Sequence, residues 1–558
     1  MAFFQQPPAL GNQFSEDRIL QSYLQRHVPE HVLAEIRPSL EHMGELSAGH
    51  LRRLATHCRR DEPQHIPYDP WGQRVDAVHV PESWREFARV ASREGLISLA
   101  YERAHGALSR LHQFAMVYLF DASTQMYTCP LAMTDGAART LEVLGPETLR
   151  ERALPRLTSR DPDAAWTSGQ WMTERPGGSD VGRSETVARQ ENGEWRLYGT
   201  KWFTSAVTSD MALTLARPQG NSEGSKGLAL FYVELRDSNG ALRNIRVNRL
   251  KEKLGTWQLP TAELTLDGTP AVPMAGLEHG VRNMANMLNI TRTWNAVGSV
   301  AKMRRGIALA RDYARKRVAF GAPLADKPLH LETLADMSAE HEAAFQLAFA
   351  AVRLLGQEEV GELDESGRAL LRLVQPVAKA VTAKQSIAVA SESLEAFGGA
   401  GYVEDTGLPE LLRDAQVLSI WEGTTNVLAL EALRAVSKKP QALGSYAQMV
   451  QRAADSATDP RLGEAANIAR QAAEAAVQWA QAHRDAPAAL EAGARRFVLT
   501  VGRSLALALL VEQAQWSLDT LGDGRSCEAA QRFAHRGINH LQTHSAPEAV
   551  RALALEEA

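Results

Sequence analysis

Cysteine is scarce in this chain, with three residues in 558. Cys58, Cys129 and Cys527 are scattered, so they fit neither a disulfide framework nor a zinc site, and they suit a reducing compartment. The chain also lacks the basic start and apolar core of a signal peptide, and any apolar run near the ~18 residues of a membrane span. We therefore expect a cytoplasmic protein with no membrane span and no bound metal.

Excess charge of one sign is also missing. The net charge is −5, and the composition, 44% hydrophobic and 23% charged, is ordinary for a globular protein. This balance argues against a protein that coats nucleic acid over its whole surface, although it leaves room for a local basic patch. No internal repeat is present. The length exceeds what one core usually holds, so two to four domains are expected.

Periodicity divides the chain into four parts. Residues 1–160 have apolar residues at helical spacing, and a loop rich in Pro and His is expected from Asp61 to Pro81. Residues 161–276 have the texture of a compact antiparallel β domain, with turn signals such as Asn192-Gly193 and Asp267-Gly268 between strands. The strands are expected at 195–198, 211–215, 228–233 and 262–266.

Helical spacing returns over residues 277–439, and Lys438-Lys439-Pro440 marks a boundary before residues 440–558, where three or four further amphipathic helices are expected. The predicted fold is therefore mostly α, with an inserted antiparallel β domain and an additional C-terminal helical domain. The expected helices of the last two parts are 281–317, 328–356, 365–398, 425–437, 442–457, 460–484, 487–520 and 526–541.

Two segments of the β domain have the residues of a binding site. In 170–180 a strand runs into the glycine-rich turn Gly177-Gly178-Ser179-Asp180, where backbone N–H groups and small hydroxyls can hydrogen-bond a heterocycle or a phosphate. In 199–205 large aromatics stand beside hydroxyl residues and could wall a flat ring. Taken singly, the first segment is more often an ordinary hairpin connection, and the aromatics of the second are more often part of a β-domain core.

Two segments of the helical part complete the set. Residues 315–321 place arginines and a glycine at a helix end, which suits a solvated C-terminus or an arginine free to meet a phosphate. Residues 395–402 contain a glycine-rich turn that allows close backbone approach. A short helix at 411–416 then leads to Glu422, a carboxylate between Trp421 and Gly423 and a candidate general base.

In this order and at these separations, the four segments resemble the acyl-CoA dehydrogenase family of flavoproteins over about residues 80–437. The resemblance implies FAD as cofactor, a fatty acyl-CoA as substrate and at least a dimer, with a homotetramer as the usual form. Glu422 matches the catalytic base. The positions that match flavin contacts are Met172, Thr173, Gly178, Ser179, Phe203, Ser205, Arg317, Phe320, Gly398, Gly399, Thr424 and Asn426.

Within this resemblance, Arg317, Phe320 and the Gly398-Gly399 turn would reach the FAD of a neighbouring subunit. Ser179 is also expected at the acyl-CoA, as is Trp421, which precedes the base. The family's Asp-x-x-Arg pair at the CoA end is represented by Asn289 and Arg292, so the arginine is kept and the acid is not.

The AidB-type, alkylation-response subgroup is more similar still. The shared segments are 170–174, 201–205, 249–255 and 419–423, and the length beyond residue 440 also fits. Two other features depart from the wider family, which often has Gln at the position of Glu395 and Thr at that of Ala319; Glu395 is shared with AidB-type proteins.

The resemblance implies FAD-dependent α,β-desaturation of an acyl-CoA, with reoxidation by an electron-transfer flavoprotein. An alternative is an AidB-type flavoprotein that binds double-stranded DNA after alkylation damage. Residues 441–558 contain eleven Arg, no Lys and thirteen acidic residues, a balance that disfavours a duplex-binding domain. Arg495-Arg496 and Arg525, Arg532 and Arg536 could still form a local patch. A third alternative is a flavoprotein that binds an acyl chain without turnover.

Overall fold

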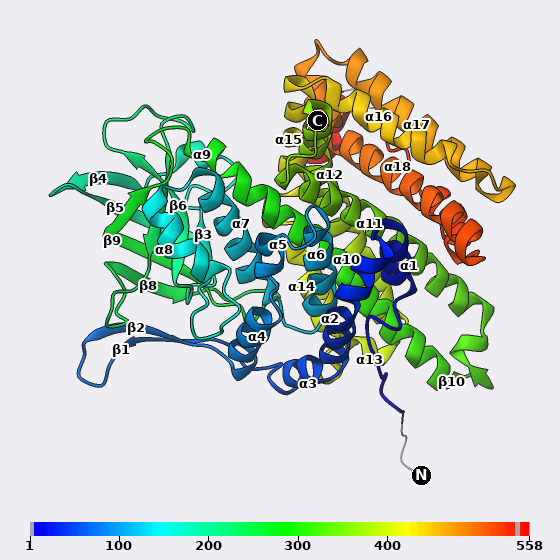
Figure 1. The fold of residues 1–558 in the computed structure, drawn as a ribbon, viewed down its shortest axis with the longest axis horizontal. Coiled ribbons are helices and arrows are strands. Elements are labelled where there is room, and N and C mark those ends of the chain that lie inside the picture. The colour runs from blue at the N-terminus through cyan, green and yellow to red at the C-terminus, as the bar shows by residue number, and fades with distance from the viewer. Residues whose placement is uncertain (1–4, 542–546, 557–558) are drawn as a thin grey trace.

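The computed structural model describes residues 5–541 and 547–556, and Figure 1 shows a central helical body with the β domain on one side and the C-terminal helices on the other. The N-terminal region is helical, as predicted. Asp17 caps its first helix by accepting hydrogen bonds from the N–H groups of Ile19 and Leu20. The helices are α1 (Arg18–His27), α2 (Glu30–Ala48), α3 (His50–His57), α4 (Glu82–Arg93), α5 (Ser98–Glu102), α6 (Leu108–Asp121), α7 (Thr128–Leu144) and α8 (Glu147–Leu157).

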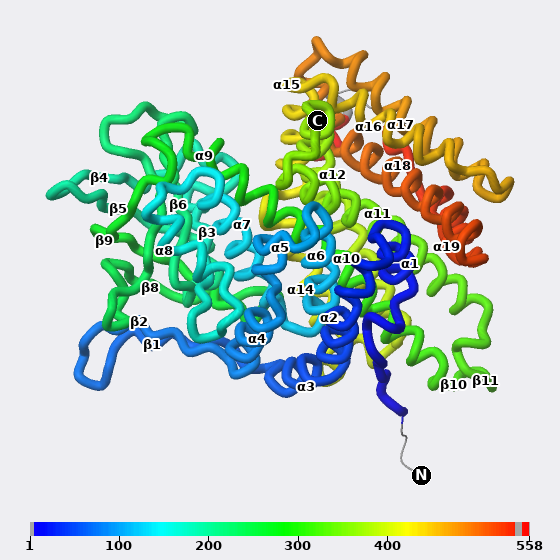
Figure 2. Tube along the Cα trace, viewed as in Figure 1, coloured from blue at the N-terminus to red at the C-terminus, as the bar shows by residue number. Residues whose placement is uncertain are grey.

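The loop expected from Asp61 to Pro81 is instead a β-hairpin, so that prediction is wrong. Strands β1 (Gln64–Tyr68) and β2 (Arg74–His79) pair antiparallel. The hairpin extends beneath the β domain (Figure 2). Its buried residue is Asp76, which accepts hydrogen bonds from His65, Arg74 and the backbone N–H of Val247 on β8. Long-range polar contacts of this kind leave no periodic signal in the sequence.

The β domain contains one seven-stranded sheet. Most pairs are antiparallel, as predicted, but β3 and β4 each pair in parallel with β6. Its core side chains include Leu197, Phe231 and Leu264, which are fully buried. The strands are β3 (Ser168–Trp171), β4 (Val187–Glu191), β5 (Glu194–Ser205), β6 (Met211–Pro218), β7 (Ala229–Glu234), β8 (Ile245–Leu250) and β9 (Thr261–Pro273).

Three long helices, α10, α11 and α12, pack against each other in the centre of the molecule. They confirm the helical prediction for this region, and their buried residues join one hydrophobic core with the N-terminal helices. The elements are α9 (Gly280–Asn283), α10 (Ala285–Lys316), β10 (Val318–Ala319), β11 (Ala322–Pro323), α11 (Pro328–Glu359), α12 (Glu365–Glu395), α13 (Gly399–Tyr402), α14 (Leu408–Leu418) and α15 (Thr425–Lys438).

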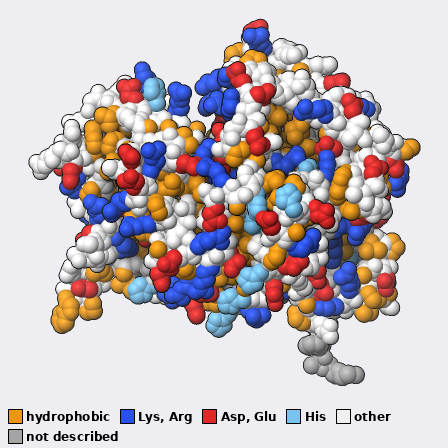
Figure 3. Space-filling model, viewed as in Figure 1, with side chains coloured by type: hydrophobic (Ala, Val, Ile, Leu, Met, Phe, Trp, Pro, Cys, Tyr) orange, Lys and Arg blue, Asp and Glu red, His pale blue; other side chains and the backbone are white. Residues whose placement is uncertain are grey.

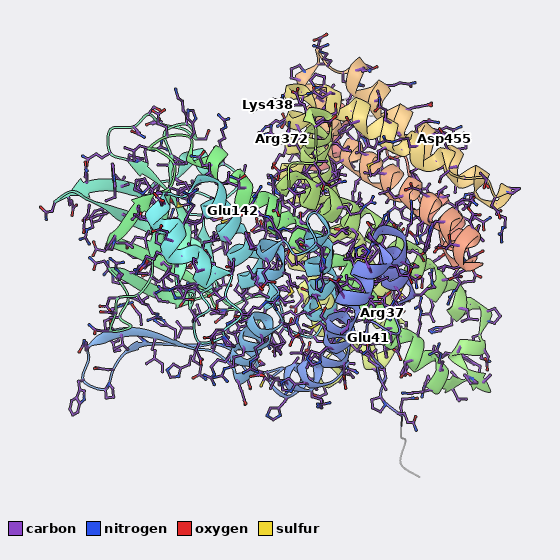
Figure 4. All side chains as sticks on the ribbon, viewed as in Figure 1. Arg37, Glu41, Glu142, Arg372, Lys438 and Asp455 are labelled. Atoms are coloured by element: carbon purple, nitrogen blue, oxygen red, sulfur yellow. The ribbon has the colours of Figure 1, made fainter. Side chains whose placement is uncertain are left out.

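The C-terminal helices pack on the outer side of α11 and α12. Lys438, the last residue of α15, and Arg372 of α12 lie near this junction (Figure 4). The ion pair between Arg503 and Glu340, at 2.9 Å, joins α18 to α11. These helices are α16 (Gln441–Asp455), α17 (Gly463–Ala482), α18 (Pro487–Leu521), α19 (Arg525–Ala534) and α20 (Pro547–Leu555).

Helix α18 is long and apolar enough to cross a membrane, although no apolar run of that length was expected from the sequence. Its apolar window is 89% buried within the protein. It packs against α11, α12, α16, α17 and α19. A helix that is apolar on all sides and covered on all sides is the central helix of a bundle.

Candidate active site

The loop between α14 and α15 carries Glu422 in a left-handed backbone conformation, with φ = 56°. Gly423 follows with φ = 102°, and Thr424 then caps α15. A non-glycine residue in the left-handed region is uncommon and costs about 1–3 kcal/mol, so the surroundings must hold it there. Side chains from three other elements do so.

The carboxylate of Glu422 is held from α10 and faces β3. Thr291 donates its hydroxyl to Glu422 Oε2 at 2.6 Å. Gln170 Nε2 lies 3.5 Å from the same oxygen, and Gln170 Oε1 is buried without a hydrogen-bond partner in the described part of the chain. A carboxylate fixed by one short hydrogen bond and half-exposed is placed to accept a proton from a molecule entering between α10 and β3.

The backbone carbonyls of this loop are bound by two buried cations. Arg292 Nε lies 3.3 Å from the Glu422 carbonyl oxygen, and its guanidinium forms a bidentate pair with Glu431 at 2.6 and 2.7 Å. Lys379 Nζ donates to the Gly423 carbonyl at 2.7 Å. Burial lowers the pKa of Lys379 to about 7; the charge of Glu422 opposes this shift and that of Arg292 reinforces it.

The glycine-rich turn after β3 is fixed to β5 by a buried ion pair. Lys201 Nζ lies 2.7 Å from Glu174 Oε1, and both side chains are almost fully buried. The Trp202 N–H donates to the Thr173 carbonyl at 3.0 Å. Gly178 stands so close that an added Cβ would lie 2.4 Å from Thr173 Oγ1. Glycine is therefore required where the turn folds back over Thr173.

Immediately after Trp202, β5 carries an exposed aromatic ring and a half-buried hydroxyl. Phe203 is 57% exposed although it is large and apolar, and Lys251 Nζ lies 4.8 Å from its ring centre. Ser205 lies 3.2 Å from the Thr261 hydroxyl. An exposed aromatic face beside hydroxyls suits a flat heterocycle, because the ring gains apolar contact while its polar edge finds hydrogen bonds.

Cys129 of α7 lies close enough to Glu422 to be affected by its charge. Burial, together with the charge of Glu422, raises the pKa of the Cys129 thiol to about 12, so the thiol stays protonated. On the other side of the loop, Trp421 Nε1 donates to Asn295 Oδ1 at 2.5 Å. This hydrogen bond fixes Trp421 to α10, next to the half-exposed carboxylate.

Most of the residues singled out in the sequence lie on or next to the Glu422 loop, α10, β3 and β5, and Gln170 Nε2, 3.5 Å from Glu422 Oε2, links the loop to β3. These residues are Met172, Thr173, Gly178, Ser179, Phe203, Ser205, Asn289, Arg292, Trp421, Glu422, Thr424 and Asn426. Asn426 is exposed and accepts a hydrogen bond from Arg495 of α18 at 3.3 Å. Asn289 is half-buried on α10, where its carbonyl oxygen accepts from Thr293.

Four predicted residues lie elsewhere in the chain. Arg317 follows α10 and Phe320 lies beside β10, at the end of the helical body away from the β domain (Figure 1). Phe320 is 97% exposed. Gly398 and Gly399 are also exposed, and a Cβ added to either would meet nothing within 4 Å. In Figure 1, β10 and α13, which adjoin these four residues, lie apart from α15, which follows the Glu422 loop.

The sequence did not reveal Thr291, Lys379 or Glu431 as members of this site. Thr291 lies between two residues that were identified, Asn289 and Arg292, and its place beside them could have suggested it. Lys379 is in the middle of α12 and Glu431 is inside α15, so only the packing of these helices brings them to the loop.

Family models match nearly the whole chain. They are the AidB N-terminal domain over residues 5–164, the acyl-CoA dehydrogenase middle domain over 169–269 and the acyl-CoA dehydrogenase C-terminal domain over 278–437. The acyl-CoA dehydrogenase 11 C-terminal domain-like model matches residues 441–557. The sequence resemblance to the family and its AidB-type subgroup is thereby confirmed.

Individual relatives point to the same family as the family models. Acyl-CoA dehydrogenase family member 11 of Caenorhabditis elegans is 41% identical over 95% of this chain and 88% of its own length. The putative acyl-CoA dehydrogenase AidB of Escherichia coli is 32% identical over 72% of this chain and 73% of its own length. The crystal structure of C. elegans ACDH-11 in complex with C11-CoA has a TM-score of 0.95 at 40% identity, and covers 100% of this chain and 97% of that chain.

A structure described as the Bd2924 apo-form has a TM-score of 0.85 at 44% identity, over 92% of this chain and 100% of that chain. The acyl-CoA dehydrogenase of Bacillus anthracis complexed with FAD has a TM-score of 0.74 at 19% identity, over 99% of this chain and 94% of that chain, and supports the fold alone. The sequence models, the relatives and the arrangement of the site agree, and this chain belongs to the acyl-CoA dehydrogenase family.

Proposed function

We propose that this protein is an FAD-dependent acyl-CoA dehydrogenase that introduces an α,β double bond into a fatty acyl-CoA thioester. The observation that carries the proposal is the carboxylate of Glu422, fixed by Thr291 and facing the end of β3. The similarity to ACDH-11, whose crystal structure holds C11-CoA, supports an acyl-CoA as the ligand. Membership of the acyl-CoA dehydrogenase family, whose members use FAD, supports the cofactor.

The residues around β3 and β5 fit a flavin. Thr173 and the turn at Gly178 and Ser179 offer hydrogen bonds and close backbone approach, while Phe203 and Ser205 offer a ring face and a hydroxyl. When bound, FAD supplies the acceptor for the hydride that leaves the substrate β-carbon. Met172, Thr424 and Asn426 complete the contacts that we assign to the cofactor within one chain.

The chain itself moves the proton. Glu422 takes the proton from the substrate α-carbon onto its carboxylate as the double bond forms, and Thr291 holds that carboxylate in place. We assign the Glu422 backbone N–H to the thioester carbonyl, where a hydrogen bond acidifies the α-carbon. Arg292 and Lys379 hold the loop carbonyls, and so keep the base and this N–H in one geometry.

Titration of the purified yellow protein under anaerobic conditions tests this proposal. Acyl-CoAs of about four to eighteen carbons are added, and bleaching of the flavin absorbance is expected with at least one chain length. Glu422→Gln should keep FAD bound but abolish the bleaching. Full bleaching by the Gln variant would remove Glu422 from the mechanism. Binding without bleaching by the wild-type protein would favour a protein that holds the acyl chain without turnover.

The alternative function, binding of double-stranded DNA, has less support from the C-terminal helices. Arg525 pairs with Asp523, Arg532 with Glu332, and Arg536 with Asp336. Arginines that already have carboxylate partners contribute little to a phosphate-binding patch. A duplex that shifts in a gel at physiological salt, more weakly as salt rises, would favour this alternative.

A further inference from the structure

A cavity lies away from Glu422, between α3, α6, α10 and the segment from α13 to α14. Its volume is about 470 Å³, within the range of small-molecule sites. Residues 5–8 of the N-terminal segment line one side of it, and Gly407 to Asp414 line another. Glu422 and Thr291 are not among its lining residues. We call it the α3–α14 cavity.

Two guanidinium groups in this cavity donate only to neutral oxygens of the described chain. Arg305 is 5% exposed and donates to the Ala122 carbonyl at 3.0 Å and to the hydroxyls of Ser123 and Ser47 at 2.7 and 3.3 Å. Its Nε has no hydrogen-bond partner among the residues described. Arg52 donates to the Pro8 carbonyl at 3.3 Å. Over residues 5–541 and 547–556, no ion pair with a carboxylate is found for either.

The two arginines also repel each other. Burial lowers the pKa of Arg305 to about 9, and the charges of Arg52 and Arg304 contribute to the shift while Asp121 opposes it. A buried cation without a partner is costly, and a second cation beside it raises the cost. An anion between Arg52 and Arg305 would relieve both effects.

The acidic residues of the cavity do not supply that anion. Asp121 pairs with Lys302 at 3.0 Å, and Asp405 pairs with Arg60. Burial and the neighbouring charge of Asp414 raise the pKa of Glu410 to about 8, so its carboxyl is largely protonated at neutral pH. Asp414, which also lines the cavity, accepts a hydrogen bond from the Thr256 N–H, so none of these four acidic residues is paired with Arg52 or Arg305 in the described part of the chain.

We propose that the α3–α14 cavity binds a small organic anion, with its carboxylate or phosphate between Arg52 and Arg305. The apolar part of the ligand lies against Leu309, Phe397 and Leu411, which line the same space. The site is separate from the loop of Glu422, but Phe397 and Ala400 flank the Gly398-Gly399 turn, so the test uses the protein with FAD bound.

Isothermal titration calorimetry on the full-length protein with its cofactor tests this site. The probes are inorganic phosphate, AMP and octanoate, with adenosine and octanamide as the uncharged counterparts of the last two. At least one anion should bind at one site per chain, and its uncharged counterpart should bind at least tenfold more weakly. A response to AMP or to octanoate distinguishes a phosphate ligand from a carboxylate ligand.

Variants locate the binding. Arg52→Gln should weaken the affinity for the anion at least tenfold, whereas Arg53→Gln is the matched control because Arg53 is the exposed neighbour on α3 and does not line the cavity. Glu422→Gln should leave the affinity unchanged. The proposal is overturned if no probe binds with a Kd below about 1 mM, or if Arg52→Gln and Arg53→Gln bind the anion equally well.

Discussion

At the scale of single residues, the central feature is a base held in a backbone conformation that it would not adopt alone. Glu422 has φ = 56°, and three side chains from two helices bind its carboxylate or the adjacent carbonyls: Thr291, Arg292 and Lys379. The arrangement explains how a flexible carboxylate on a loop gains a defined direction. It also assigns Arg292, expected at the CoA, to the loop itself.

The hydrogen bond from Thr291 should be measurable in the rate of flavin reduction. Thr291→Val removes the 2.6 Å contact while nearly keeping the side-chain volume. A hydrogen bond to a charged group contributes about 1.5–3 kcal/mol, so part of this loss should slow reduction by acyl-CoA about tenfold or more. Thr291→Ser keeps the hydroxyl and should retain most of the rate. Equal rates for the Val variant and the wild type in anaerobic stopped-flow would contradict the positioning role.

The lowered pKa of Lys379 predicts how the free energy of unfolding depends on pH. Its pKa is about 7 in the folded protein, against an ordinary lysine value of 10.5, so between these values the unfolded chain binds more protons than the folded one. The charged lysine is therefore a cost to folding, and this cost is largest below pH 7. As the pH rises above 7 the cost decreases, by at most about 1.4 kcal/mol per pH unit. Relative to Lys379→Met, the wild type should therefore become more stable from pH 7 to 9.

Urea unfolding of the two proteins at several pH values measures this difference, since groups common to both cancel. Lys379→Arg is the control, because an arginine stays charged over the whole range. A constant difference between wild type and the Met variant from pH 7 to 9 would mean that Lys379 remains fully charged in the folded state.

The sequence predicts the site residues that lie in local motifs, and it misses those that only the packing of helices brings to the site. Glu422, Thr173 and Ser205 lie in local motifs whose residue types already indicate their chemistry. Lys379 and Glu431 lie in helices with an ordinary pattern, and no local signal distinguishes them. Glu174 and Lys201 also lie in two predicted motifs. The sequence does not show that they form a buried ion pair, which joins those motifs.

At the scale of secondary-structure elements, the long helices and strands β3, β5, β6, β7 and β9 were predicted, whereas β4, β8 and the β1–β2 hairpin were missed. Periodic apolar residues identify α10, α11 and α12 because each buries one or more faces in the core. The hairpin buries little apolar surface: its outward residues include Trp71, 93% exposed, and Tyr68, 52% exposed. In the space-filling view, hydrophobic side chains gather at this corner of the molecule (Figure 3). Side chains of the hairpin form polar contacts to β8: Asp76 accepts from the Val247 N–H and Arg74 donates to the Val247 carbonyl.

Asp76 should control whether the hairpin stays attached to the β domain. It is 3% exposed, accepts from His65, Arg74 and the Val247 N–H, and has φ = 45°. Asp76→Ala leaves these donors without a partner, at a cost of about 2 kcal/mol or more. Trypsin should then cleave after Arg74 several-fold faster.

The matched control is Asp76→Asn, because asparagine also tolerates the left-handed region and keeps an acceptor oxygen. Cleavage is followed by mass spectrometry under native conditions. If the Ala variant resists trypsin as well as the wild type does, the hairpin is held by other contacts.

At the scale of the whole molecule, one chain does not bring all the residues matched to the cofactor into a single site. The residues matched to flavin contacts form two groups, one around Glu422 and one comprising Arg317, Phe320, Gly398 and Gly399. The second group is on a different part of the surface, where Phe320 is 97% exposed and Tyr402, next to the glycine turn, is 89% exposed. Large apolar side chains this exposed are typical of an interface between subunits.

We therefore propose that two copies of the chain complete each cofactor site, in a dimer or a homotetramer. Burying a phenylalanine contributes about 1.5–3 kcal/mol, so Phe320→Ser should shift the protein toward the monomer and weaken FAD binding about tenfold. Light scattering after size-exclusion chromatography and FAD titration of the apoprotein measure the two effects. Leu553→Ser, at an 85% exposed position on α20, is the control and should change neither. A Phe320→Ser protein that keeps both its assembly and its FAD affinity would place the second group of residues outside the cofactor site, and FAD would then be bound by one chain.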